Sequence, residues 1–269
     1  MFDFSEEELH RYSRHILLKE VGVEGQQKIK DAKVLVVGAG GLGSPVIMYL
    51  AAAGVGNIGI VDGDAVDVSN LQRQVIHHTA DIGLSKAESA REKALQINPH
   101  VNIVVFKDFL RADNALQIIS DYDFVVDCTD NFPVKFLIND ACVMAGKAFS
   151  HGGILHFEGQ TFTHVPGSAC YRCIYDAPPP KDSVPSCAQA GVLGAIAGML
   201  GTIQAAEVLK YFTGAGELLT NKLLIFNALT MDFNKISLDK NHRCQVCGDN
   251  PVITQLIDYE KNACELTNH

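Results

Sequence analysis

A glycine-rich turn is the first segment of this sequence whose residue types could do chemistry. Gly38, Gly40 and Gly43 form a G-x-G-x-x-G pattern that follows an apolar run and opens a helical stretch. Glycines in that context let backbone N–H groups approach a phosphate at the start of a helix. Asp62 ends the next apolar run, where an acid usually binds ribose hydroxyls. The pattern predicts a nucleotide site; the alternative is a turn used only for packing.

Cations and a further acid follow this turn along the chain. Arg73 and Lys86 exceed what the pyrophosphate of a dinucleotide requires, so they favour a triphosphate. Asp130 follows another strand at the same edge of the sheet, and Mg²⁺ prefers one or two carboxylates together with phosphate oxygens. Each has an ordinary alternative: Arg73 and Lys86 could be surface cations, and Asp130 could cap the next helix. Their joint placement predicts ATP and Mg²⁺.

Four of the eight cysteines form two C-x-x-C pairs, Cys170 with Cys173 and Cys244 with Cys247. In a chain with no secretory signal, such pairs suggest a metal before disulfides. Four sulfurs make a closed tetrahedral shell that suits structural Zn²⁺. A redox-active pair and an iron–sulfur cluster are the alternatives. The sequence therefore predicts a Zn(Cys)₄ staple, far from the chemistry.

The composition is that of a globular protein that works away from nucleic acid and membranes. The chain has 269 residues, of which 47% are hydrophobic and 20% charged, and a formal charge of −9. An acidic surface does not favour nucleic acid as a partner. The apolar stretch 191–206 is rich in small residues and too short for a confident membrane span, so it predicts a buried helix. An acidic N-terminus without an apolar segment leads us to expect a cytoplasmic protein.

Alternating strands and helices must position these side chains. Apolar runs predict strands over 33–37, 57–61, 101–106 and 124–127, and the segments between them predict helices over 44–53, 85–97 and 112–120. This alternation is typical of an α/β fold with a Rossmann-type, mostly parallel sheet and helices on both faces. The second half continues it with antiparallel strands over 156–165 and 223–238, around a helix at 191–212. The proline-rich segment 176–185 predicts a loop.

Taken together, the motifs resemble those of the ThiF/MoeB/HesA family, bacterial relatives of ubiquitin-activating enzymes. The resemblance covers residues 5 to about 250 in order, and it is carried by Arg11–Arg14, Gly38–Gly43, Ser69–Gln74, Asp127–Asn131 and the paired cysteines. It implies one adenylation domain over residues 1–250. Residues 251–269 then form a short tail that resembles the linker which leads to a rhodanese domain in longer relatives. Sulfur would have to come from a separate donor protein.

The activity that the resemblance implies is ATP-dependent adenylation of the C-terminal glycine of a ubiquitin-like sulfur carrier of the MoaD/ThiS type. Pyrophosphate is released, and the product serves sulfur transfer in molybdopterin or thiamine biosynthesis. A terminal carboxylate has a pKa of about 3.5 and needs no general base, so catalysis would rest on positioning and charge stabilisation. The implied ATP contacts are Gly41, Asp62, Ser69, Asn70, Leu71, Gln72, Arg73, Lys86, Asp130 and Asn131.

Catalytic roles fall on a smaller set by the same resemblance: Asn70, Arg73, Lys86, Asp130 and Arg14. The resemblance places Arg14 in the active site of the partner subunit, which implies a homodimer. Cys187, after the proline-rich loop, would bond covalently to the carrier, or it is an incidental loop thiol.

Two other functions remain open at this point. A dinucleotide-dependent oxidoreductase would explain the glycine-rich turn and Asp62, but it leaves Arg73, Lys86 and Asp130 without a role. A catalytically silent, zinc-bearing interaction module would keep the fold without the activity. ATP–pyrophosphate exchange separates these readings.

Overall fold

A single eight-stranded sheet organises the protein. The computed structural model describes residues 2–180 and 191–259. The strand order is β3-β2-β1-β4-β5-β6-β7-β8. Strands β1, β2, β3, β4 and β5 run parallel to one another, and β6, β7 and β8 each pair antiparallel with the strand before them. The strands are β1 Lys33–Val37, β2 Asn57–Val61, β3 Asn102–Phe106, β4 Phe124–Asp127, β5 Ala148–Leu155, β6 Glu158–His164, β7 Lys222–Asn227 and β8 Asp232–Ser237. The expected sheet, mostly parallel with an antiparallel continuation, is confirmed.

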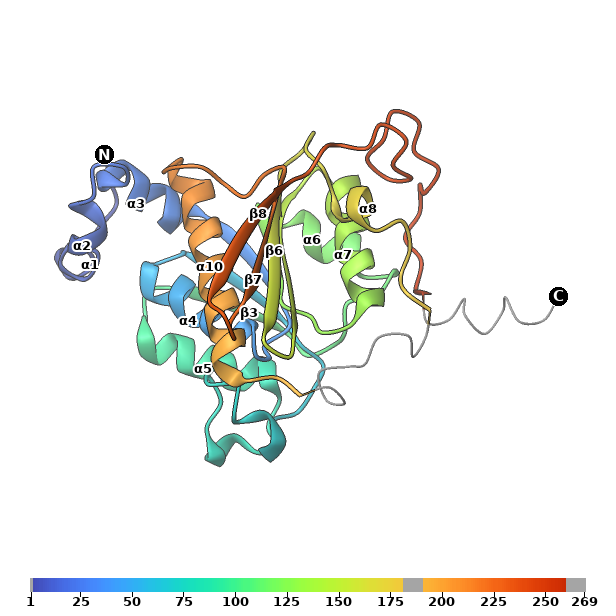
Figure 1. The fold of residues 1–269 in the computed structure, drawn as a ribbon. Coiled ribbons are helices and arrows are strands. Elements are labelled where there is room, and N and C mark those ends of the chain that lie inside the picture. Colours follow the sequence, from blue (N-terminus) through green and yellow to red (C-terminus); the bar gives the residue numbers. More distant parts are fainter. Residues whose placement is uncertain (1, 181–190, 260–269) are drawn as a thin grey trace.

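Helices cover both faces of the sheet, as the alternating pattern predicts (Figure 1). One apolar cluster joins β1 and β4 to α4, α5 and α10, and a second joins the opposite side of these strands to α6 and α7. The helices are α1 Glu6–Arg11, α2 Ser13–Ile16, α3 Gly22–Asp31, α4 Gly43–Ala53, α5 Lys86–Ile97, α6 Ala115–Ser120, α7 Phe132–Met144, α8 Tyr171–Ile174 and α10 Gly194–Thr213. Among the described residues, no helix is both long and apolar enough to cross a membrane.

Strand β5 is the element that sequence patterning did not predict. Its middle four residues are Ser150, His151 and two glycines, which interrupt the apolar run expected of a buried strand. The strand expected over 156–165 begins only at Glu158, because His156 takes the left-handed conformation (φ 54°) and turns the chain back on β5. The pairing of β5 with β4 brings His151 beside Asp127.

The segment after the second C-x-x-C pair packs against the domain. Tyr259 donates a hydrogen bond to Asp140 of α7 (3.0 Å), and Asp258 accepts one from the backbone N–H of Ala112 (2.9 Å). Arg172, which lies between Cys170 and Cys173, binds Asp140 through two nitrogens, contacts the Tyr259 hydroxyl and donates to the carbonyl oxygen of Asp176. One guanidinium of α8 thus contacts α7, the segment around Tyr259 and the start of the proline-rich segment.

Candidate active site

The glycine-rich turn between β1 and α4 depends on close backbone approach. Gly38 has a φ of +96°, and its N–H donates to the carbonyl oxygen of Val61 on β2 (2.8 Å). A Cβ on Gly43 would lie 1.9 Å from the carbonyl oxygen of Gly38, so only glycine lets the helix begin this close to the strand. The residue at the N-cap, Leu42, has no side-chain cap. Within the first turn of α4, Ser44 already donates to the carbonyl oxygen of Gly40 (2.9 Å) and Pro45 has no N–H, so an anion here would meet the N–H groups of Gly43 and of the turn before it.

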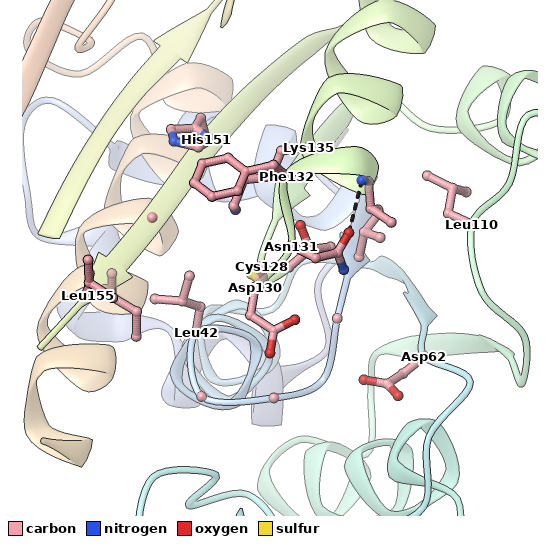
Figure 2. Close-up of a pocket in the computed structure, with 18 of the residues that line it drawn as sticks. Leu42, Asp62, Leu110, Cys128, Asp130, Asn131, Phe132, Lys135, His151 and Leu155 are labelled. Carbon is pink, nitrogen blue, oxygen red and sulfur yellow. Dashed lines mark hydrogen bonds between the residues drawn. The ribbon is translucent and has the colours of Figure 1, made fainter. Parts of the chain in front are cut away.

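A cavity of about 560 Å³ lies over the carboxyl ends of the parallel strands. Six of the residues expected to contact ATP line it: Gly41, Asp62, Arg73, Lys86, Asp130 and Asn131. Figure 2 shows Asp130 above the glycine-rich turn and Asp62 to one side of it. The convergence expected at this edge of the sheet is present, and direct contact of these residues with ATP stays a prediction.

Asp62 is held in place by the turn that it faces. Its Oδ2 accepts a hydrogen bond from the backbone N–H of Ala39 (2.8 Å), and its Oδ1 accepts one from Asp64 (2.9 Å). Burial raises the pKa of Asp62, and the two backbone N–H groups work against that rise. Each carboxylate oxygen keeps a lone pair for a further donor, which suits a ribose hydroxyl.

The two cations that the sequence predicted for the pocket have different partners. Arg73 donates from Nη1 to the carbonyl oxygen of Ser69 (3.0 Å), so its remaining nitrogens are available to a ligand. Lys86 is buried, and its Nζ forms an ion pair with the exposed carboxylate of Asp64 (2.9 Å). The sequence analysis did not single out Asp64 as the partner of Lys86, although its position two residues after Asp62 is a usable signal.

The sequence left two roles open for Asp130, a ligand of Mg²⁺ or the cap of the next helix, and the structure gives the capping role to Asn131. Asn131 caps α7, because its Oδ1 accepts a hydrogen bond from the backbone N–H of Val134 (3.0 Å). The alternative that Asp130 caps this helix is therefore wrong. No described residue gives the carboxylate of Asp130 a hydrogen bond or an ion pair. An exposed, unpaired carboxylate in a phosphate pocket is suited to Mg²⁺.

A buried polar cluster at the carboxyl end of β4 was missed by sequence reasoning. Asp127 accepts hydrogen bonds from Lys135 (3.1 Å), Thr129 (2.7 Å) and His151 (3.0 Å). Burial alone would raise the pKa of Asp127, but the charge of Lys135 and the hydrogen bond from His151 lower it to about 2. Lys135 and His151 line the pocket as well. Their spacing in sequence gave no sign of this cluster: the pairing of β4 with β5 brings His151 to Asp127, and the first turn of α7 supplies Lys135.

Several residues expected at the site do not line the pocket. Ser69, Asn70, Leu71 and Gln72 belong to a short 3₁₀ turn and its exit, where Asp67 binds Ser69 and Asn70. Arg14 is exposed on α2 and outside this pocket, and its expected place in the partner subunit stays a prediction. Cys187 lies outside the described residues.

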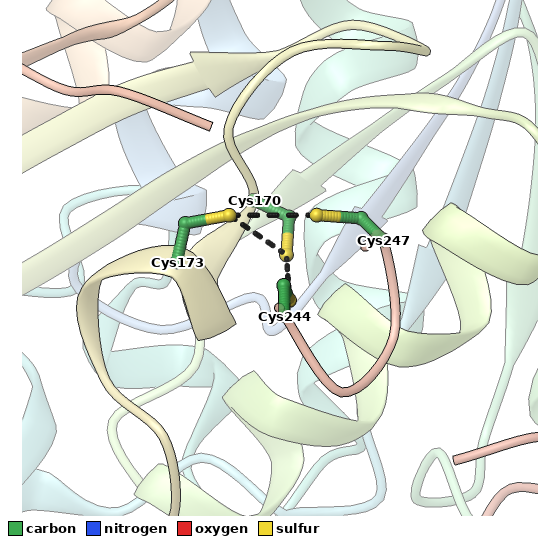
Figure 3. Close-up of side chains that lie close together, drawn as sticks. All are labelled: Cys170, Cys173, Cys244 and Cys247. Atoms are coloured by element: carbon green, nitrogen blue, oxygen red, sulfur yellow. Dashed lines mark hydrogen bonds between the residues drawn. The ribbon is translucent and has the colours of Figure 1, made fainter. Parts of the chain in front are cut away.

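The four paired cysteines converge on one point (Figure 3). Their sulfur atoms all lie within 4.8 Å of one another, with 3.6 Å between Cys170 and Cys244 and 3.4 Å between Cys173 and Cys247. A tetrahedral metal with sulfur bonds of about 2.3 Å spaces its ligands by about 3.8 Å. The cluster therefore has the dimensions of a four-thiolate metal site.

Fold and site together define a nucleotide-binding α/β protein with a four-thiolate cluster. The family model described as the ThiF family matches residues 12–246, and the chain belongs to this family. It is 46% identical to the sulfur carrier protein adenylyltransferase of Thermus thermophilus over 263 residues, which are 96% of this chain and 97% of the relative. The resemblance read from the motifs is confirmed.

Other relatives are longer than this chain. It is 47% identical over 262 residues to a probable adenylyltransferase/sulfurtransferase, MoeZ, of Mycobacterium tuberculosis, and it spans 65% of that protein. It is 48% identical over 258 residues to the mouse adenylyltransferase and sulfurtransferase MOCS3 and spans 56% of it. Among solved structures, Escherichia coli MccB has the same fold, with a TM-score of 0.79 and 24% identity over 92% of this chain and 76% of that one.

Proposed function

We propose that this protein adenylates the C-terminal carboxylate of a small ubiquitin-like sulfur carrier with ATP and releases pyrophosphate. What carries the proposal is the single pocket shared by Gly41, Asp62, Arg73, Lys86 and Asp130. The named activity of the full-length relative in Thermus thermophilus supports the same reaction. A nicotinamide enzyme would leave the cations and Asp130 without a role. Molybdopterin and thiamine biosynthesis are the pathways that such a carrier would serve.

The residues of the pocket fit ATP from one end to the other. The ribose binds the carboxylate of Asp62, the phosphates lie over the uncapped start of α4, and Arg73 and Lys86 offset their charge. Asp130 is the ligand for Mg²⁺, which neutralises charge on the phosphates and on the departing pyrophosphate. Because the attacking carboxylate is already ionised, these residues need only hold it in line with the α-phosphate.

The four-cysteine cluster is proposed to hold structural Zn²⁺ through Cys170, Cys173, Cys244 and Cys247. Closed thiolate shells of this kind stabilise a fold and leave no open position for a substrate. The cluster joins the loop before the proline-rich segment to the loop after β8, which are distant in sequence. None of the four cysteines lines the pocket, in keeping with a structural role.

Arg14 is assigned to a site shared between two subunits. From the family resemblance we propose a homodimer in which Arg14 of each subunit reaches the phosphates bound by the other; Arg14 is exposed and does not line the pocket of its own subunit, in keeping with this. Residues 1–250 form the adenylating unit and residues 251–269 a tail. Cys187 is either the site of a covalent bond to the carrier or an incidental thiol.

ATP–pyrophosphate exchange with a purified carrier tests the proposal. Wild-type protein should exchange only when carrier and Mg²⁺ are both present. Asp130→Ala and Arg73→Ala should abolish exchange while the melting temperature is kept. Arg91→Ala is the matched control, because Arg91 is an exposed arginine of α5 that does not line the pocket. Normal exchange in both pocket variants would remove the assignment.

A further inference from the structure

His151 leaves one ring nitrogen without a partner inside the pocket wall. The side chain is 2% exposed, and its Nε2 is buried with no hydrogen-bond partner among the described residues. Native proteins rarely leave a buried polar atom unsatisfied, because the cost is about 1–3 kcal/mol. Gly153 lies next to it in the pocket wall, and a Cβ there would stand 3.4 Å from Nε2. Glycine at this position leaves the nitrogen uncovered by a side chain.

The other ring nitrogen determines what Nε2 can do. Nδ1 lies 3.0 Å from Oδ2 of Asp127, and an ionised carboxylate only accepts hydrogen bonds, so Nδ1 carries the proton. The rings of Tyr171 and Phe162 pack at 4.6 Å and 5.5 Å and fix the orientation of the imidazole. In a neutral imidazole with a protonated Nδ1, Nε2 is an acceptor. Burial lowers the pKa of His151 and keeps the ring neutral.

The surroundings of His151 offer an anion nothing to bind. Lys135 is the nearest cation, and its three N–H bonds are directed at the two carboxylate oxygens of Asp127 and the carbonyl oxygen of Gly152. A phosphate or carboxylate would find only an acceptor at Nε2. The group that fits next to His151 is therefore a hydrogen-bond donor.

The position of His151 in the sheet separates it from the nucleoside end of the pocket. Asp62 follows β2 and His151 lies on β5, with β1 and β4 between them. Three strand spacings of about 4.8 Å put about 14 Å between the two positions. The start of α4 follows β1, between them, so a donor beside His151 belongs to the group that attacks the α-phosphate rather than to the nucleoside.

We propose that Nε2 of His151 accepts a hydrogen bond from the last amide N–H of the protein tail whose carboxylate is adenylated. This inference rests on the proposed function and adds a substrate-binding residue to it. The terminal carboxylate points toward Asp130 and the phosphates, while the peptide bond before it lies over Gly153 and donates to His151. His151 thereby recognises a tail that ends in an ordinary secondary amide.

A carrier whose last amide is replaced by an ester tests this contact. A ubiquitin-like carrier from the same organism is prepared with a terminal glycolate in place of glycine, so that an oxygen replaces the last N–H without added bulk. With wild-type protein, kcat/KM for carrier-dependent exchange should fall about tenfold, the size of one buried hydrogen bond, and KM for ATP should stay unchanged. Equal rates for the amide and ester carriers would overturn the inference.

A double-mutant cycle assigns the loss to His151. In His151→Asn, the side-chain amide can still donate to Asp127, but the Nε2 acceptor is gone. We expect kcat/KM with the amide carrier to fall about tenfold relative to wild type, and kcat/KM with the ester carrier to be no lower than with the amide carrier. An ester penalty that persists in His151→Asn would overturn the assignment. His156→Asn is the control, because His156 is exposed on the turn after β5 and does not line the pocket.

The readouts separate failure of the inference from failure of the proposed function. Absence of exchange in wild-type protein with the amide carrier would remove both. Exchange that is indifferent to the ester removes the role of His151 alone. Circular dichroism and ATP binding check that His151→Asn is folded. If this variant does not fold, the comparison of the amide and ester carriers with wild-type protein still tests the hydrogen bond from the last amide.

Discussion

Asp127→Asn is expected to be the most destabilising single change at the site. The carboxylate is fully buried between Lys135 and His151, so replacing it with a neutral amide leaves the ammonium of Lys135 buried without its counter-charge. Loss of one partner of a buried ion pair typically costs about 3–5 kcal/mol. We expect a loss of this size at pH 7 in the free energy of unfolding, measured by urea titration.

The pH dependence of this loss follows from the pKa of Asp127. The value falls from 3.8 to about 2 on folding, and 1.8 units correspond to about 2.4 kcal/mol of stability. A carboxylate whose pKa is lower in the folded protein stabilises the fold at pH values above its pKa in the unfolded chain. This stabilisation is lost as the pH falls through the pKa of the folded state. By linkage, about 1 kcal/mol of it is gone at pH 3 and about 2 kcal/mol at pH 2. The destabilisation caused by Asp127→Asn should shrink by these amounts in acid.

Urea titrations of wild type and variant at pH 7 and pH 3 measure both quantities. Asp113→Asn serves as the control, since its side chain is exposed and, among the described residues, its ion pair is with the partly exposed Arg111. A difference between wild type and Asp127→Asn that is below 1 kcal/mol at pH 7 would contradict the buried-pair argument. A difference that grows in acid would contradict the sign of the pKa shift.

Three further predictions concern the metal, the glycine-rich turn and the start of α7. Cys244→Ser should lose bound zinc, measured by elemental analysis, and lower the melting temperature; retained zinc would refute the four-thiolate site. Gly43→Ala should weaken ATP binding at least tenfold by calorimetry, because a Cβ would overlap the turn, whereas Gly198→Ala has open space, and equal effects would refute the steric argument. Asn131→Ala should lower the free energy of unfolding, measured by urea titration, by about 1 kcal/mol. Asp130→Ala should lower it little while it abolishes exchange. A larger loss of stability in Asp130→Ala than in Asn131→Ala would return the capping role to Asp130.

Local patterns made the first half of the fold predictable. Buried parallel strands such as β1 and β2 are continuous apolar runs, and the glycine turn between β1 and α4 is a contiguous motif. The strand β5 lacks such a run, because His151 and Gly153 line the pocket while Ser150 and Gly152 lie against Gln204 of α10. Functional positions are where patterning fails for a physical reason.

The site was predictable only where its residues follow strand ends or recognisable motifs. Asp62 and Asp130 follow strands, so the edge that they share could be expected. The contacts of Lys86 with Asp64 and of His151 with Asp127 arise from tertiary packing and have no signature in sequence spacing. The choice of Asn131 rather than Asp130 as the cap also required backbone geometry.

The guanidinium of Arg172 has a practical consequence for anyone who handles the protein. It binds Tyr259 and the carbonyl oxygen of Asp176, which lies between the pocket-lining residues Tyr175 and Ala177, so a purification tag joined just after Tyr259 would pull on the segment that borders the pocket. Fusion partners and surface attachment for binding measurements are better made at the other end of the chain, on a linker long enough to clear α1.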